Sequence, residues 1–490
     1  MRMKHPLTLA LVVCSACSPG TVSSRAPSPA EPLVMTDAGM LSGVADPARG
    51  VVEFRGIPYA SAPVGQLRWA SPTPPAPWSG VRAASRPGKN CMQDQVYSDV
   101  DPFAVGVSED CLYLNVWTTG VDPAARRPVM VWFHGGGYIA GFGAEGRHDG
   151  ARLAQKGAVV VTLNYRLGAF GFLSHAALAS TSPQGTSGNY GILDQVAALQ
   201  WVRRNISQFG GDSSRVTIFG ESAGGSSVGS LIASPLAKGL FHGAILQSGN
   251  AIGSTRSRSA AEADGLRFAT VLGVNGTDAG AAAQLRQIPA DSVQHATRRP
   301  NGTGGFTSVY SPTLVADGWV LPRTVDSALA LGAANIVPVI VGATSGEGDA
   351  AYATARAFAR LVTARNAPAY LYLFSRVGDD SVNRKRGAYH SADITFTFGL
   401  PRPILESAGH TTYDAALAEA MTDYFVAFAA TGNPNGAPRA SPRAVWPVYE
   451  TATDAYIELG PQVVARSALR RTVYDSLDKA GRDRGQVRPR

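Results

Sequence analysis

Cysteine, charged side chains and long apolar runs are all scarce in this chain. Only four of its 490 residues are cysteine, and charged residues make up 16%, below the roughly 25% of an average globular protein. No stretch approaches the roughly 18 to 20 apolar residues that span a bilayer, so we expect no transmembrane segment. Wholesale disorder is excluded because 45% of the residues are hydrophobic. Metal-ligand spacings and nucleotide-binding glycine motifs are also missing, so no cofactor and no metal are predicted.

Positive charge exceeds negative charge but is not concentrated. Lys and Arg number 44 against 36 Asp and Glu, a net charge of +8, and most of these residues are scattered. Nucleic-acid binding is disfavoured because it requires a clustered basic face. The densest basic stretch follows Tyr474 and contains Lys479, Arg482, Arg484, Arg488 and Arg490. We interpret residues 476–490 as a flexible, solvated tail.

The N-terminus has the pattern of an export signal. Arg2 and Lys4 precede a short apolar run, residues 7–13, which ends in small residues before Cys17. Residues 14–17 resemble a bacterial lipoprotein cleavage box in which Cys17 would be lipidated. Cleavage after Ala16 or further along is the alternative. Either way, residues 1–17 are predicted to be a signal and residues 18–34 a Ser/Pro/Ala-rich tether, in a protein of the bacterial envelope or a secreted one.

Two cysteines remain once the signal is set aside. Cys91 and Cys111 form an even pair, which favours a disulfide in an exported chain. The bridge would close a loop with 19 intervening residues and stabilise the fold by roughly 3 kcal/mol in the chain-entropy model. Two buried free thiols are the alternative.

Apolar, β-branched runs alternate with helical patterns through the middle of the chain. Residues 129–133, 158–163, 216–219 and 243–246 are typical of strands buried on both faces, whereas residues 194–206 repeat apolar side chains at helical spacing. This alternation predicts an α/β fold with a mostly parallel central sheet flanked by helices. Because no linker or internal repeat divides the chain, residues 35–475 are predicted to form one domain.

A GxSxG motif directly follows the predicted strand at 216–219. Glycines at Gly220 and Gly224 would relieve the steric clash of a sharp turn that presents Ser222 at the start of a helix. A GxSxG motif alone is a weak signal, but a strand before it and a helix after it favour a nucleophile elbow. Upstream, the strand at 129–133 runs into His134 and the three glycines 135–137. Such a loop can aim several backbone N–H groups at one point, as an oxyanion hole requires.

These motifs, in this order, make the chain similar to the type-B carboxylesterases, an α/β-hydrolase family that includes cholinesterases and fungal lipases. The resemblance runs nearly end to end and is carried by residues 56–60, 109–117, 164–168, 188–191, 219–225, 247–249 and 432–435. It implies a serine esterase with an α/β-hydrolase fold, a small-molecule ester as partner and no cofactor. Together with the export signal, the prediction is an exported esterase. The oligomeric state is left open.

The family resemblance also implies the site residues. It predicts a triad of Ser222, Glu347 and His390, with Asp349 as a rival acid. The other predicted residues are the oxyanion donors Gly136, Gly137 and Ala223, and the supporting Glu221 and Ser248, although Ser248 can also be read as a turn residue at a strand end. We read the remaining histidines as structural: His148, His175, His242, His295 and His410.

Two features distinguish this chain within the family. Only 42 residues separate Glu347 from His390, which implies shortened cap insertions and a shallow, permissive site. The loop between Cys91 and Cys111 lacks Trp and is rich in Asp and Glu, which disfavours a cholinesterase or a lipase lid. A lipase-like enzyme for longer acyl esters and a non-catalytic adhesion module are the alternatives, and retention of the three triad residues argues against the latter.

Overall fold

A computed structural model describes residues 31–96, 103–300, 306–379, 384–385, 387–400, 412–436 and 443–483. From Pro32 onward these residues form one compact unit. The predicted signal and Cys17 lie outside the described residues. The described part of the chain contains no helix long and apolar enough to cross a membrane.

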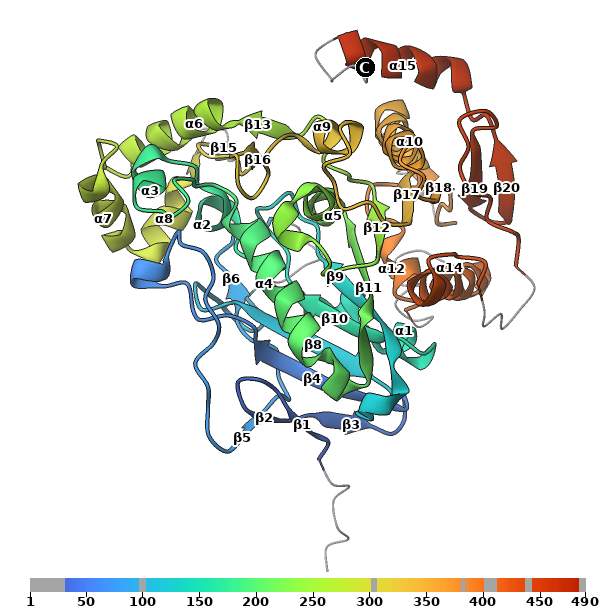
Figure 1. Cartoon of the computed structure of the whole chain (residues 1–490), viewed down its shortest axis with the longest axis horizontal. Helices are drawn as coiled ribbons and strands as arrows, with labels where there is room; N and C mark the ends of the chain where they lie inside the picture. Colours follow the sequence, from blue (N-terminus) through green and yellow to red (C-terminus); the bar gives the residue numbers. More distant parts are fainter. Residues whose placement is uncertain are drawn as a thin grey trace, which may run out of the picture. The chain divides into compact units, whose positions relative to one another are not determined.

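One large mixed sheet organises this unit (Figure 1). Its strand order is β20-β19-β18-β17-β12-β11-β9-β10-β8-β4-β3. All neighbours from β10 to β19 pair in parallel, and antiparallel pairs lie toward the two edges. The strands are β3 Val44–Asp46, β4 Val51–Pro58, β8 Tyr113–Thr118, β9 Arg127–Phe133, β10 Val159–Leu163, β11 Gly211–Glu221, β12 Gly243–Gln247, β17 Val339–Thr344, β18 Ala369–Phe374, β19 Ala455–Leu459 and β20 Val463–Ser467. The predicted mostly parallel central sheet is confirmed.

Helices cover both faces of this sheet, which explains the continuous apolar runs within its central strands. In β9, Val129 and Val131 pack into one core cluster, while Met130 and Trp132 pack into the other. The first cluster includes side chains of α4, α5, α9 and α10, and the second includes those of α1, α12 and α14. Their bounds are α1 Ala151–Gln155, α4 Tyr190–Asn205, α5 Ala223–Ala233, α9 Val325–Ala330, α10 Asp349–Thr363, α12 Ile394–Thr397 and α14 Thr412–Thr431.

Smaller elements surround this framework. Strands β1 Leu33–Met35, β2 Met40–Ser42 and β5 Val81–Ala83 form a separate sheet. Three further two-stranded sheets consist of β6 Asn90–Cys91 with β7 Val107–Ser108, β13 Thr255–Ser257 with β16 Leu314–Ala316, and β14 Arg298–Pro300 with β15 Phe306–Ser308. The other helices are α2 Gly168–Phe172, α3 Ala176–Ser180, α6 Arg258–Val271, α7 Ala279–Gln287, α8 Ala290–Ala296 and α15 Arg471–Asp483.

The strand and helix predictions from apolar patterning are confirmed, with shifted ends. The four predicted strands correspond to β9, β10, β11 and β12, and the predicted helix at 194–206 lies in α4, which begins four residues earlier at Tyr190. The Cys91–Cys111 disulfide is also present, with the two Cα atoms 4.9 Å apart.

Two predicted boundaries were wrong. The tether was predicted to extend to residue 34, but β1 already begins at Leu33, because Val34 is buried and β1 pairs with β2. The basic tail was predicted to be flexible from residue 476, but α15 continues to Asp483. Its Asp478 pairs with the buried Arg356, a partner far away in the sequence. Residues 484–490 lie outside the described part.

Candidate active site

Ser222 stands at a sharp turn between β11 and α5. Its backbone has φ 57° and ψ −121°, a region that non-glycine residues rarely adopt. The chain packs closely here, because a Cβ on Gly224 would lie 2.0 Å from the carbonyl oxygen of Phe133 and one on Gly220 would lie 2.5 Å from the backbone of Gly224. The glycines of the motif are therefore required by the close backbone approach, as the elbow prediction assumed.

The three predicted triad side chains meet in a single line of hydrogen bonds. His390 Nε2 lies 2.8 Å from Ser222 Oγ, and His390 Nδ1 lies 2.5 Å from Glu347 Oε1. Ser222 and His390 are 168 residues apart in the sequence. The sheet brings Ser222 and Glu347 to the same place, because Ser222 follows β11, Glu347 follows β17, and both strands end at the same edge of the parallel region. His390 contacts both of them there.

Glu347 is held from several directions. Its Oε2 accepts hydrogen bonds from Ser248 Oγ at 2.6 Å, from the Thr344 backbone N–H at 2.9 Å and from Thr344 Oγ1 at 3.0 Å. Burial alone would raise the pKa of this carboxyl, but the hydrogen bonds from His390 and Ser248 outweigh it and lower the pKa below its usual value. Glu347 is therefore ionised and oriented toward the imidazole.

Asp349, the rival acid, points elsewhere. Its Oδ1 lies 2.6 Å from Arg470 Nη1 and accepts a hydrogen bond from Tyr474 at 3.3 Å. Glu347 is thus the carboxylate that contacts His390.

The pKa of His390 is shifted upward. The hydrogen bond to Glu347 raises it to about 9 against the opposing effect of burial, and the nearby Glu221 contributes in the same direction. Glu221 Oε1 lies 3.3 Å from His390 Nε2 and accepts a hydrogen bond from Ser391 at 2.7 Å. Burial raises the pKa of Glu221 itself to about 8. Both predicted supporting residues, Glu221 and Ser248, therefore lie in contact with the triad.

The glycine loop after β9 lies beside the serine. Gly136 and Gly137 have φ values of 99° and 61°, and a Cβ on Gly136 would lie 2.1 Å from the Ala140 carbonyl oxygen. The loop lies close to the nucleophile, because a Cβ placed on Gly135 would be 3.2 Å from Ser222 Cβ. Ala223 is the first residue of α5, so its N–H has no acceptor within the helix. The three predicted oxyanion donors thus lie on the two segments that meet at Ser222.

The other described histidines take part in contacts away from the triad. His148 Nδ1 contacts the Phe142 carbonyl oxygen, His175 accepts a hydrogen bond at the start of α3, and His242 accepts one from the Val216 N–H. His295 lies in the last turn of α8, and the buried His134 of the glycine loop contacts the Gly135 carbonyl oxygen at 2.9 Å and stacks on Tyr165. His410 lies outside the described residues.

Sequence reasoning missed Thr344 and Ser391. Thr344 forms a capping box with Glu347, and the T-x-x-E spacing is a recognisable signal for that arrangement. Ser391 adopts φ 73° next to His390, and no sequence pattern indicates this.

The arrangement suits acyl transfer to a serine. A hydroxyl next to an imidazole that is oriented by a carboxylate can act as a nucleophile, and backbone N–H groups beside it can stabilise an oxyanion. Among the described residues, no group of three or more His, Cys, Asp or Glu side chains could hold a metal ion.

Comparison with known proteins gives consistent matches. The model of the carboxylesterase family matches residues 30–356 and 350–477. A fumonisin B1 esterase of Sphingopyxis macrogoltabida is 43% identical over 72% of this chain, and a para-nitrobenzyl esterase of Bacillus subtilis is 42% identical over 64% of it. The alignment spans 63% of the length of each of these two relatives.

Solved structures match over more of the chain. A PNB esterase structure superposes with a TM-score of 0.78 at 32% identity, covering 91% of this chain and 99% of its own. A carboxylesterase from Geobacillus stearothermophilus gives a TM-score of 0.75 at 32% identity, with 90% and 99% covered.

Proposed function

Since the chain belongs to the carboxylesterase family, we propose that it is a serine esterase that hydrolyses carboxylic esters through an acyl-enzyme intermediate on Ser222. The observation that carries this proposal is the hydrogen-bonded line from Ser222 through His390 to Glu347. These hydrogen bonds favour an enzyme over a non-catalytic binding module, because a binding surface does not require a serine, a histidine and a carboxylate in hydrogen-bonded series. Covalent labelling of Ser222 by a fluorophosphonate, together with turnover of p-nitrophenyl acetate, tests it.

In the first half of the reaction, Ser222 Oγ attacks the ester carbonyl carbon and passes its proton to neutral His390 Nε2. Negative charge develops on the carbonyl oxygen, where the N–H groups of Gly136, Gly137 and Ala223 can stabilise it. The carbon–oxygen bond to the alcohol then breaks, and His390 returns the proton to the departing oxygen. The products of this half are an alcohol and an acyl ester on Ser222.

In the second half, water attacks the acyl-enzyme while His390 Nε2 accepts its proton. The carbon–oxygen bond to Ser222 breaks, the proton passes to Ser222 Oγ, and the carboxylic acid leaves. Glu347 remains ionised throughout and stabilises the imidazolium through Nδ1–H.

Replacing Glu347 should change the pH dependence of this reaction. Since His390 must be neutral to accept a proton, kcat/KM rises as pH increases through the pKa of His390, which is raised to about 9. Glu347→Gln removes the main cause of the raised His390 pKa. The acidic limb of the profile should therefore move to lower pH, toward the value of about 6.5 for free imidazole, while the plateau falls by about a hundredfold or more.

The profile of kcat/KM against pH for p-nitrophenyl acetate measures both effects. Glu262→Gln is a matched control, because Glu262 lies in α6, where it pairs with Arg258, and does not contact the triad, so its loss should leave the profile unchanged. An acidic limb at the same pH in Glu347→Gln would contradict the role of this carboxylate.

We also propose that the enzyme accepts a broad range of esters. The segment between Glu347 and His390 is short, and α10 and β18 together occupy half of it, so little chain is available there to narrow the cleft. A cavity of about 330 Å³ is lined in part by Ile139, two residues after Gly137, and by Gly168 and Tyr310. No triad residue lines it, so it offers room beyond the oxyanion loop and not at Ser222 itself. Two relatives are named for different substrates, as a fumonisin B1 esterase and a para-nitrobenzyl esterase, which is consistent with a fold that accommodates varied esters.

Measured kcat/KM across acetyl, butyryl, octanoyl and benzoyl esters should vary by less than about a hundredfold, because an open site buries little of the acyl group and so gains little of the about 1–3 kcal/mol that each methylene contributes in a well-formed pocket. A stronger preference for one small acyl group would contradict the open-site proposal. A strong preference for octanoyl would favour the lipase-like alternative.

Finally, we propose that the protein is exported and held in a bacterial envelope through lipidated Cys17. The short apolar run at 7–13, ending in Ser15, Ala16 and Cys17, supports this. Stable anchoring requires two or three acyl chains, since a single chain binds membranes only marginally. Mass spectrometry of the mature N-terminus decides between an acylated Cys17 and an unmodified start after Ala16.

A further inference from the structure

Glu347 lies in a short, largely exposed turn. Glu347 ends a single 3₁₀ turn, Ser345–Glu347, whose first two residues are exposed, and Gly348 follows at φ 81° with no atom near the position of a Cβ. Helix α10 begins immediately afterward, at Asp349. The turn itself is held by the hydrogen bonds of Ser248 and Thr344 to Glu347, and by one from the Gly346 N–H to the Ala388 carbonyl oxygen. Besides these contacts, the direction of the carboxylate depends on β17 before the turn and on the start of α10 after it.

The start of α10 is attached to the C-terminal helix. Asp349, the first residue of α10, contacts Arg470, which directly precedes α15, and Tyr474, which lies in its first turn. Tyr474 is buried and packs against Tyr352, one turn into α10, with ring centroids 5.2 Å apart. These contacts lie only two to five residues beyond the triad acid.

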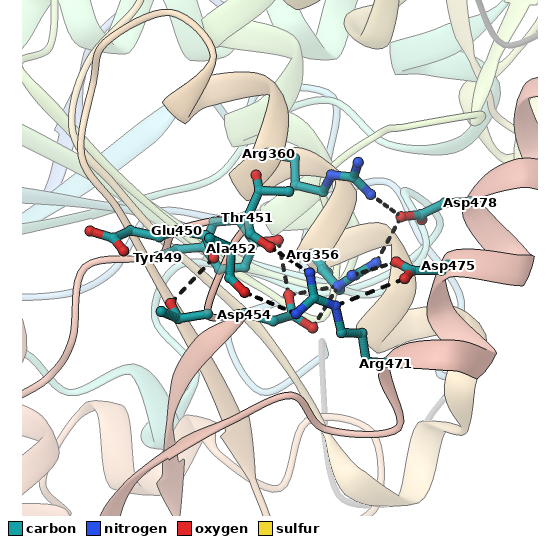
Figure 2. Close-up of polar contacts among 11 residues, drawn as sticks. Arg356, Arg360, Tyr449, Glu450, Thr451, Ala452, Asp454, Arg471, Asp475 and Asp478 are labelled. Atoms are coloured by element: carbon teal, nitrogen blue, oxygen red, sulfur yellow. Dashed lines mark hydrogen bonds and ion pairs between the residues drawn. The ribbon is translucent and has the colours of Figure 1, made fainter.

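Further along α10, Arg356 makes a second attachment (Figure 2). Its side chain is 1% exposed and contacts three carboxylates: Asp454 at 2.7 Å, Asp475 at 2.7 Å and Asp478 at 2.8 Å. Two of these belong to α15, and Asp454 directly precedes β19. A buried guanidinium needs such partners, since removing them would leave an uncompensated charge in the interior. The register of α10 against α15 is thus fixed at two points.

From these contacts we propose that α15 is a positioning element for the triad acid. By holding Asp349 and Arg356, it fixes the start of α10 and thereby the orientation in which Glu347 contacts His390. This inference rests on the proposed esterase activity. It assigns a mechanistic role to a helix whose second half, from residue 476, was predicted to be part of a solvated tail.

The Asp349–Arg470 pair allows this role to be separated from a contribution to stability. The Arg470 side chain is 57% exposed and that of Asp349 is 31% exposed. Exposed ion pairs stabilise folded proteins by only about 0–1 kcal/mol. Loss of this pair should therefore change Tm little, and a large change in catalysis would come from the displaced acid.

The test is Arg470→Gln. We expect kcat to fall by about 5- to 50-fold with KM within about twofold of wild type, because small misplacements of catalytic groups cost up to about a hundredfold in rate. The acidic limb of kcat/KM should move to lower pH, since His390 loses part of its hydrogen bond to Glu347. Electrostatics alone would act in the opposite direction, because removing a cation raises the pKa of a nearby imidazole.

Two further variants act as controls. Arg470→Lys keeps a cation for Asp349 and should retain most of the activity. Arg466→Gln removes the Arg466–Glu458 pair between β20 and β19, in which Arg466 is 52% exposed, and should leave kcat and the pH profile unchanged. The other acidic groups that act on His390, Glu221 and Asp393, are identical in all of these variants.

A low-field proton NMR signal from His390 Nδ1–H supplies a readout that is independent of turnover. In Arg470→Gln this signal should shift or broaden relative to wild type and to Arg466→Gln. An unchanged signal with unchanged kcat, or an acidic limb that moves to higher pH, would overturn the positioning role. Absence of ester turnover in the wild type would instead refute the proposed function, and the NMR comparison would still decide this inference.

Discussion

Ser222→Ala should reduce kcat for p-nitrophenyl acetate by at least about a thousandfold while leaving the fold intact. The reaction loses the hydroxyl that lies 2.8 Å from His390 Nε2, and losses of this size or larger are typical when a catalytic serine is removed. Folding should be preserved, because alanine has the same Cβ as serine and the backbone strain at φ 57° is unchanged. Steady-state kinetics and a thermal melt measure the two parts of this expectation.

Ser230→Ala is the matched control for Ser222→Ala. Ser230 lies in α5 and donates a hydrogen bond to the Ser226 carbonyl oxygen at 2.8 Å, so its removal costs one contact within the helix and leaves the triad untouched. This variant should turn over ester at nearly the wild-type rate and should still be labelled by a fluorophosphonate. Wild-type-like turnover in Ser222→Ala would disprove the assignment of the nucleophile.

His390→Ala should also silence the enzyme, by about a thousandfold or more, since no general base would then contact Ser222 Oγ. His410→Ala, which replaces the other histidine downstream of Glu347, should leave turnover largely unchanged. His242→Ala provides a third comparison, because the His242 side chain accepts a hydrogen bond from the Val216 N–H and does not contact the triad. Loss of activity in His410→Ala together with an active His390→Ala would overturn the chain order Ser222, Glu347, His390.

The residues nearest to Ser222 could be predicted because their constraints are local. The sharp turn needs glycine where the backbone of Gly224 approaches the Phe133 carbonyl oxygen, and this requirement is visible as a motif. Central strands such as β9 carry a continuous apolar run, residues 128–133, because both faces of the sheet are covered. The amino-acid sequence shows this run directly. The family pattern then identified Glu347 and His390, which no local rule distinguishes from other acids and histidines.

The tail shows why the remaining features could not be predicted. Asp475 and Asp478 lie among Lys and Arg in a stretch that resembles a solvated end. Nothing nearby in the sequence indicates that Arg356, about 120 residues earlier, would be buried beneath them. A buried charge attracts carboxylates through space, independently of their separation along the chain.

Local sequence therefore specified the turn at Ser222, the glycine loop, the alternation of strands and helices and the pair of cysteines, because each depends on a few neighbouring residues. Tertiary structure alone decided that Thr344 holds Glu347, that Ser391 donates a hydrogen bond to Glu221, and that α15 is attached to the helix that begins just after the acid. These contacts depend on burial and charge, and only the packing of the sheet and its helices brings the residues that make them within reach of one another.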